Sequence, residues 1–473
     1  MSFVLRVSKK SALSEPARTV FRTLSPVGSL HSKYNCRLTP AIVKRNKSSA
    51  KSDSGFSEKY PVPYAAYRNA KLDVWTMFNM AAAKANAVNL GQGFMNFPAD
   101  KMVLKAGSDA ISDPVSAQYA PPRGLPILLS ELAKRYTASL KTNIDPAKNI
   151  MISSGANEGI FCGLLAFLGL NTNSEAIVIE PAFDQYTPNI IMAGGKPVYV
   201  PLRVNSNLNP ESHNISSNEW KLDCKELEAK INSNTKVLIV NTPHNPTELE
   251  EIAEIAKKHN LLVISDEVYE NLYYDGEKHI SIASLPGMLD RTIVIGSVGK
   301  MFGVTGWRIG WLIGGEHLIT ACIAAHTRTT FVSPTPIQLA TAYAFQRSVE
   351  FKFFETQRAQ YLERRNKLMK LFDQINLPYS VPKGSYFLLV NSSRISIPKD
   401  FEIPDHVKER GRSFSVCYFL TVKIGIACIP PTEFYSEENM HLAEDYVRFA
   451  FCKSDDVFVE TEKRLSKLVP YLV

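Results

Sequence analysis

The chain has 473 residues, 45% of them hydrophobic, which is enough for a large buried core and suggests two folded lobes. No apolar stretch reaches the roughly 18–20 residues that a membrane-spanning helix needs, so we expect no membrane partner. The net charge of +8 comes from the N-terminus: residues 1–52 hold eleven Lys and Arg and one acid, and the rest holds 43 basic and 45 acidic residues. A nearly neutral folded part argues against a nucleic-acid-binding protein.

The predicted elements begin with a leader over residues 1–55, which is basic, rich in serine and almost free of acids. This composition is typical of a mitochondrial transit peptide. The alternative is a disordered basic tail without an address, which would leave the protein in the cytoplasm. A secretory signal is disfavoured because no compact apolar segment follows the first charges.

Residues 56–100 are predicted to form an N-terminal arm and part of a small domain, with one short amphipathic helix near 73–86. Between 101 and 345, apolar runs at 176–180, 236–241, 261–265 and 292–296 alternate with helical patterns such as 248–259. This alternation predicts an α/β fold with a mostly parallel central sheet. A long charged helix at 350–373 then leads into a smaller C-terminal α/β domain over 346–473.

The seven cysteines are scattered and include no Cys-x-x-Cys pair, a pattern typical of free thiols in a reducing compartment. The nine histidines form no Cys/His cluster with zinc-ligand spacing. We therefore expect no metal site.

Polar residues gather at four predicted strand ends, where ligand sites of open α/β sheets lie. The first, at 149–158, joins a strand to a helix through a small-residue turn, which favours an anion site, although an ordinary capped turn is equally simple. The second follows the strand that ends at 241 and contains Asn245. The third places Asp266 directly after an apolar strand, where a buried acid needs a cap or a cation as partner. The fourth contains Lys300 in a glycine-rich apolar stretch; burial would make its amine a nucleophile, and the alternative is a solvated loop lysine.

Together these segments resemble the class I/II, fold-type I aminotransferases, which depend on pyridoxal 5'-phosphate (PLP). The resemblance rests on Asn-Thr-Pro-His-Asn-Pro at 241–246, Ser-Asp-Glu-Val-Tyr at 265–269, and Ser-Val-Gly-Lys with Gly-Trp-Arg-Ile-Gly-Trp at 297–311. It runs from about residue 60 to the C-terminus. The segments at 90–94, 154–159, 180–186 and 429–434 are similar to those of the kynurenine aminotransferases that overlap glutamine transaminase K, and to their fungal branch.

The resemblance implies a role for each residue around the cofactor. Lys300 would bind PLP covalently and later carry a proton, and Asp266 would pair with the protonated ring nitrogen, which keeps the ring an electron sink. Further contacts to the ring and its phosphate would come from Tyr269, Asn245, Phe183, Ala156, Asn157, Ser297 and Arg308. Tyr119 would reach the phosphate of a neighbouring subunit, so the resemblance implies a homodimer with shared active sites.

The resemblance also implies a substrate site. Arg448 would bind the α-carboxylate of the amino acid, and a structural ion pair is the alternative for a buried arginine. Gly93 and Trp75 would line the pocket from the arm, with Asn245 beside them. The expected activity is transfer of the amino group of kynurenine, and of other aromatic or bulky amino acids, to a 2-oxo acid such as 2-oxoglutarate.

One feature departs from the family pattern. After Thr247 the family continues with Gly-Lys and several more residues, whereas here the predicted helix starts at once. Two alternatives to the transaminase therefore stay open: a β-lyase acting on cysteine S-conjugates with the same residues, and a PLP-fold protein impaired by the shortened loop. The Ser297-x-x-Lys300 spacing also matches penicillin-recognising enzymes, but their Ser-Asp-Asn and Lys-Thr-Gly tripeptides are absent from the sequence.

Overall fold

The computed structural model describes residues 73–170, 172–205, 207–242 and 246–473, and residues 71–473 form one compact unit. The predicted leader at 1–55 and the start of the arm lie outside the described residues. No helix in the described ranges combines the length and apolar character that a membrane crossing requires. The three predicted boundaries between leader, arm, large domain and small domain stay predictions.

The centre of this unit is a sheet of eight strands in the order β2-β10-β9-β8-β7-β3-β4-β6. The neighbours from β9 to β4 run parallel, whereas β10 is antiparallel to β2 and β9, and β6 is antiparallel to β4. The mostly parallel sheet predicted from the alternating pattern is therefore confirmed. Its strands are β2 (Ile150–Ser153), β3 (Glu175–Glu180), β4 (Lys196–Val204), β6 (Trp220–Leu222), β7 (Thr235–Asn241), β8 (Leu262–Asp266), β9 (Thr292–Ser297) and β10 (Gly310–Ile313).

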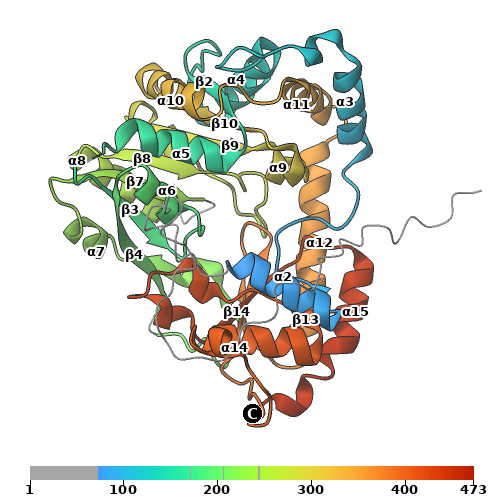
Figure 1. Ribbon diagram of the computed structural model, residues 1–473. Coiled ribbons are helices and arrows are strands. Elements are labelled where there is room, and N and C mark those ends of the chain that lie inside the picture. Colours follow the sequence, from blue (N-terminus) through green and yellow to red (C-terminus); the bar gives the residue numbers. More distant parts are fainter. Residues whose placement is uncertain (1–72, 171, 206, 243–245) are drawn as a thin grey trace, which may run out of the picture. The chain divides into compact units, whose positions relative to one another are not determined.

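Nearly every side chain of the central strands is buried, because helices cover both faces of this sheet. Val263 packs in one core with α8, while its neighbour Ile264 packs in another with α5, α6 and α10. Figure 1 shows α5 and α6 along one face of the sheet, and α4 and α11 near its β2 end. These helices are α3 (Lys101–Ser112), α4 (Pro126–Leu140), α5 (Ala156–Phe167), α6 (Tyr186–Met192), α7 (Cys224–Ala229), α8 (Pro246–Lys258), α9 (Val298–Met301), α10 (Glu316–Thr329) and α11 (Thr335–Ser348).

A second core gathers the first described helix and the C-terminal part of the chain. The helix predicted at 73–86 is confirmed as α2 (Val74–Ala85), capped by Asp73, whose carboxylate accepts from the backbone N–H of Thr76. It packs with a four-stranded sheet in the order β14-β12-β11-β5. The elements are β5 (Ile215–Ser216), β11 (Tyr379–Val381), β12 (Phe387–Asn391), β14 (Tyr446–Ala450), the pair β1 (Val88–Asn89) and β13 (Ile426–Ala427), and helices α13 (Asp405–Lys408), α14 (Arg412–Phe419) and α15 (Asp455–Leu465).

The long helix α12 (Phe353–Asp373) joins the two cores. Phe353 at its start packs beside the large sheet, and Leu368 and Phe372 near its end pack in the second core. In Figure 1 this helix (orange) runs between the two regions. The six cysteines of the described ranges are all free, as their scattered spacing predicts.

Candidate active site

The three central strand ends meet at one edge of the large sheet. Asn241, the last residue of β7, pairs with Asp266, the last residue of β8, and Asp266 pairs with Ile295 near the end of β9. The chain then turns directly from β9 into α9, which carries Lys300. Residues far apart in sequence are thus brought together because parallel strands end at the same edge.

The amine of Lys300 lies among tyrosines. Its Nζ donates to the hydroxyl of Tyr386 at 2.9 Å and lies 5.8 Å from the ring centre of Tyr269 and 5.5 Å from that of Tyr386. Tyr386 is fully buried, and its hydroxyl donates to the carbonyl oxygen of Gly93 at 2.8 Å. A Cβ at Gly93 would come within 2.7 Å of the Tyr386 ring, so only glycine lets the arm approach this closely. The sequence assigned no role to Tyr386.

The carboxyl group of Asp266 is buried beside this lysine. Its Oδ2 accepts from the hydroxyl of Tyr186 at 2.6 Å, and its Oδ1 accepts from the backbone N–H of Val268 at 3.3 Å. Burial raises the pKa of Asp266, although these hydrogen bonds and the positive charge of Lys300 act in the opposite direction. A buried carboxylate in this setting favours a cationic partner such as a protonated ring nitrogen.

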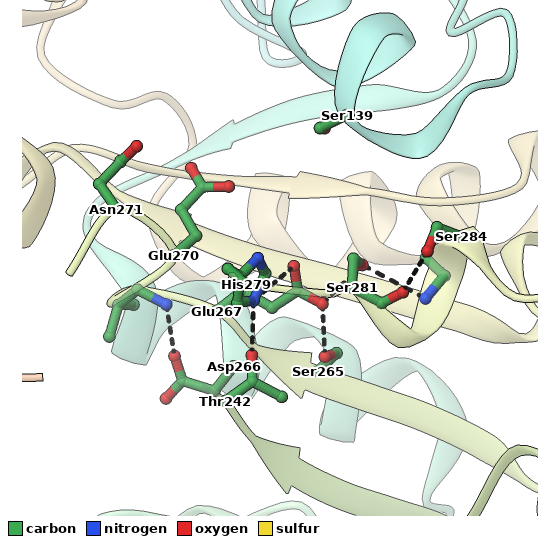
Figure 2. A network of polar contacts seen from close by, with 12 residues as sticks. Ser139, Thr242, Ser265, Asp266, Glu267, Glu270, Asn271, His279, Ser281 and Ser284 are labelled. Carbon is green, nitrogen blue, oxygen red and sulfur yellow. Dashed lines mark hydrogen bonds and ion pairs between the residues drawn. The ribbon is translucent and has the colours of Figure 1, made fainter. Parts of the chain in front are cut away.

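Behind Asp266 lies a second polar network, shown in Figure 2. Oε1 of Glu267 accepts from the hydroxyls of Ser265 and Ser281, each at 2.7 Å, and Nε2 of His279 lies 2.9 Å from the hydroxyl of Thr242. Burial raises the pKa of Glu267 to about 8, so this carboxyl group is largely protonated at neutral pH. The network fixes the end of β7, because the N–H of Thr242 also donates to the carbonyl oxygen of Asp266.

Two groups of side chains in the described ranges have the composition of metal ligands. In one, Glu270 and His279 lie beside Glu267, but Arg135 approaches Glu270 to 3.4 Å and opposes a bound cation. In the other, Oε1 of Glu158 accepts from Cys162 and lies 2.8 Å from Nδ1 of His326. Both groups are accounted for as hydrogen-bond networks, which the spacing of Cys and His in the sequence did not reveal.

An anion cradle forms where α5 begins. Gly155 precedes the helix with φ +93°, no side chain caps it, and the first N–H groups, including those of Ala156 and Asn157, have no partner in the preceding turn. A Cβ at Gly155 would lie 2.5 Å from a guanidinium nitrogen of Arg308. Ser297 joins the cradle, since it pairs across the sheet with Gly310, which also pairs with Ser153 just before the turn.

Replacing Gly155 with alanine is expected to weaken binding of a phosphate-bearing ligand by roughly 10–100-fold. The added Cβ would displace the Arg308 guanidinium and strain a backbone at positive φ, and each charge-assisted hydrogen bond that is lost costs about 1.5–3 kcal/mol. Equilibrium titration of the purified protein with PLP measures the effect. Gly306→Ala is the matched control, because a Cβ there meets nothing within 4 Å; equal losses in both variants would contradict the cradle.

Replacing Tyr186 with phenylalanine is expected to make PLP binding more sensitive to acid. The hydroxyl of Tyr186 stabilises the ionised form of Asp266, so its loss raises the pKa of Asp266 further. Because the ionised carboxylate is the form that binds a cationic ring nitrogen, the variant should lose affinity at a higher pH than the parent as the pH falls. PLP titrations between about pH 4 and pH 8 test this, and coincident affinity profiles would rule the effect out.

Arg448 on β14 is a partly buried cation without an anionic partner among the described residues. Its guanidinium lies 4.0 Å from the ring centre of Phe387, 4.3 Å from that of Phe434 and 5.6 Å from that of Trp75. Its Nε and one terminal nitrogen make no hydrogen bond within the described ranges. Burial lowers the pKa of Arg448 to about 10, which still leaves it charged at neutral pH. A charged fork with free donors favours a carboxylate ligand.

A hollow of about 550 Å³ lies next to these aromatic rings and is lined in part by Phe183, Asp184 and Phe434. The indole N–H of Trp75 donates at 2.9 Å to Asp184, which lines the hollow, so this tryptophan is held next to the lining. The half-exposed ring of Phe183 meets Tyr186 edge-on, with ring centres 5.6 Å apart. The structure therefore brings Trp75, predicted from the arm, and Phe183, predicted from the turn after β3, to one side of the site.

One further predicted residue, Tyr119, lies on the surface of this chain. Tyr119 is 83% exposed, and its ring meets that of Phe331 edge-on at 5.7 Å. Asn245 lies outside the described residues. The sequence assigned no role to Tyr186 or Tyr386, although each bonds to a residue that it did assign. Tyr186 ends the segment 180–186 that carries part of the resemblance, whereas no local pattern marks Tyr386.

The fold and this site define a class of protein: the chain belongs to the class I and II aminotransferases, whose family model matches residues 85–458. It is a PLP-dependent aminotransferase. The predictions of this family, of the fold-type I architecture and of the enzyme class are thereby confirmed.

Individual relatives show to which members of this family the chain is similar. The chain is 39% identical over 422 residues to "Probable kynurenine--oxoglutarate transaminase BNA3" of Saccharomyces cerevisiae, covering 85% of this chain and 94% of the relative. It is 36% identical to kynurenine--oxoglutarate transaminase 1 of Homo sapiens, covering 83% and 95%. The crystal structure of yeast Bna3p matches with a TM-score of 0.83 at 38% identity, covering 87% of this chain and all of that one.

Proposed function

We propose that this enzyme transfers the amino group of kynurenine, and of other aromatic or bulky amino acids, to a 2-oxo acid such as 2-oxoglutarate, which yields kynurenic acid. The observation that carries the proposal is the unpaired guanidinium of Arg448 within a wall of aromatic rings. The guanidinium suits the α-carboxylate that all these substrates share. The rings of Trp75, Phe387 and Phe434 suit an aromatic side chain, and the names of the relatives support the same substrate.

The cofactor site is assigned in the same way. PLP fits the residues present, since a phosphate matches the cradle of Ala156, Asn157, Ser297 and Arg308, and a ring cation matches the buried carboxylate of Asp266. When bound, the cofactor supplies an electron sink for the substrate's α-carbon. Lys300 would hold the cofactor and would take up the α-proton at Nζ, and Tyr269 and Asn245 would contact the ring oxygen. Phe183 would lie against the ring.

We assign the enzyme to a homodimer with shared active sites. The support is Tyr119, which the resemblance gives to the phosphate of a neighbouring subunit and which stands exposed beside the half-exposed Phe331. A tyrosine that stays this exposed in one chain is available to a second copy. Sedimentation of the purified protein should give a dimer, and a monomer that turns over at full rate would contradict the assignment.

The decisive experiment follows the absorbance of the purified protein with PLP, before and after kynurenine is added. A near-ultraviolet to visible band that shifts with kynurenine, followed by formation of kynurenic acid once 2-oxoglutarate is present, supports the transaminase. Release of a thiol and a 2-oxo acid from a cysteine S-conjugate, without net transamination, would favour the β-lyase instead. No band at all would mean that the short connection after Thr247 has impaired the site.

We also propose that residues 1–55 direct the enzyme to mitochondria. The support is the basic, serine-rich composition of this segment beside a nearly neutral remainder. A fusion of residues 1–55 to a fluorescent reporter should accumulate in mitochondria. A matched fusion with the eleven basic residues changed to glutamine should stay diffuse, and diffuse fluorescence from both fusions would place the enzyme in the cytoplasm.

A further inference from the structure

Tyr386 touches both Lys300 and the N-terminal arm through a single hydroxyl group. Its oxygen lies 2.9 Å from Nζ of Lys300 and 2.8 Å from the carbonyl oxygen of Gly93. It belongs to the turn between β11 and β12 in the second core, whereas Lys300 belongs to α9, which directly follows strand β9 of the large sheet. The hydroxyl therefore connects three separate parts of the chain at the reacting amine.

The protons at this hydroxyl can be assigned. Burial above all, with a contribution from the hydroxyl of Tyr269, raises the pKa of Tyr386 well above its ordinary value, so the phenol stays protonated. Its single proton goes to the carbonyl of Gly93, because a carbonyl oxygen can only accept. The hydroxyl must then accept from Nζ of Lys300, which fixes the direction of this hydrogen bond.

The ring of Tyr386 is held in place on several sides. It meets the ring of Tyr269 edge-on at 5.1 Å, stacks on that of Tyr361 at 6.1 Å and lies 4.8 Å from that of Phe387. The backbone N–H of Phe451 donates to its carbonyl. A side chain packed this closely cannot follow the lysine when it moves, so its hydroxyl is a fixed point for the amine.

We propose that Tyr386 is a positioning residue for Lys300: its hydroxyl receives the lysine amine whenever this amine is free of the cofactor and holds it where it takes the proton from the substrate's α-carbon. The proposal rests on the proposed transaminase function. The proton leaves the α-carbon for Nζ, and its electron pair stays with the cofactor-bound substrate. The Tyr386 oxygen accepts a hydrogen bond from Nζ and keeps this nitrogen in place during the transfer. Because the same hydroxyl bonds to Gly93, the arm that lines the substrate pocket is tied to the amine.

The test is Tyr386→Phe, which removes the oxygen and keeps the ring. Single-turnover reaction with kynurenine should slow by about 10–100-fold, since a placed acid or base contributes roughly 10²–10⁴-fold and only its placement is lost. The substrate dissociation constant should change less than about twofold. The α-deuterium isotope effect should increase, because proton transfer becomes the slow step.

A second readout does not use turnover. The rate at which the cofactor-free protein takes up PLP depends on where the amine of Lys300 is held, since this amine must meet the incoming cofactor. Uptake should slow by roughly 3–10-fold in Tyr386→Phe, because a hydrogen bond worth about 0.5–1.5 kcal/mol no longer holds the nitrogen. The control is Tyr361→Phe, which removes a hydroxyl from the ring stacked on Tyr386 and should leave both readouts unchanged.

The outcomes separate the two proposals. An unchanged isotope effect and an unchanged rate of PLP uptake in Tyr386→Phe would overturn the role of Tyr386, even if the thermal stability of the variant falls. A parent protein that takes up PLP without reacting with kynurenine would contradict the substrate proposal alone, and the rate of uptake would still decide on Tyr386. A parent that takes up no PLP would overturn both.

Discussion

Replacing Lys300 with alanine is expected to abolish the visible band of bound PLP and to lower turnover by at least about 10⁴-fold. The loss has two parts, since the same amine binds the cofactor covalently and moves the α-proton, and proton transfer alone contributes roughly 10²–10⁴-fold. In the structure the Nζ atom lies among tyrosine rings beside the buried Asp266. Absorbance spectra and kynurenic acid formation measure both parts.

Two comparisons make this result specific to the amine. Lys300→Arg keeps a positive charge next to Asp266 but cannot bond covalently to the cofactor, so it should lose the band as well. Thermal denaturation should show both variants folded, because Lys300 is only partly buried and its one hydrogen bond goes to Tyr386. A persistent visible band in Lys300→Ala would assign the cofactor to another lysine and remove the basis of the site.

The positions of the central strands were readable from the sequence because their side chains are buried on both faces. Unbroken apolar runs at 176–180 and 292–296 predict β3 and β9 to within a residue. The predicted start of α8 was less accurate. The helical pattern begins at residue 248, but the helix begins at Pro246, where the fixed φ of proline suits the first turn. The long helix predicted from 350 begins at Phe353 for a comparable reason, since Lys352 before it has φ +45°.

The same logic explains which parts of the site were predicted. Asp266 and Lys300 each follow a strand, and strand ends in a parallel sheet converge, so one sequence rule places both. Tyr386 comes from a turn in the second core, 86 residues from Lys300, and only tertiary packing brings their side chains together. Tyr186 lies 80 residues before the Asp266 to which it donates. No local pattern distinguishes Tyr386 among the 19 tyrosines of the chain, and the pattern at 180–186 includes Tyr186 without indicating its contact with Asp266.

The charged residues show a further difference between sequence and structure. The sequence alone does not distinguish an arginine that forms a structural ion pair from an arginine that binds an anionic ligand. Arg365 illustrates the first case, because Asp275 accepts from both of its terminal nitrogens at 2.7 and 2.8 Å. Arg448 illustrates the second, since rings surround it and two of its nitrogens have no acceptor in the described ranges. Only the contacts decide between the two interpretations.

This difference gives the second large prediction: replacing Arg448 with leucine is expected to reduce kcat/KM for kynurenine by about 10²–10³-fold while leaving the folded protein equally stable or more stable. The loss of activity follows from the missing partner of the α-carboxylate, since removing one member of a buried charge pair costs roughly 2–5 kcal/mol. The gain in stability follows from removing a charge that burial disfavours, as the lowered pKa of Arg448 indicates.

The matched control is Arg412→Leu. Arg412 donates to Asp445 at 2.8 Å and to the carbonyl oxygen of Ser392 at 2.7 Å, so its loss should lower the melting temperature and leave kcat/KM near that of the parent. Arg448→Lys should fall between parent and leucine variant, because lysine keeps the charge without the fork that binds both carboxylate oxygens. A large fall in the stability of Arg448→Leu would mean that this arginine already has a partner within the protein, and its role as the carboxylate receptor would then be wrong.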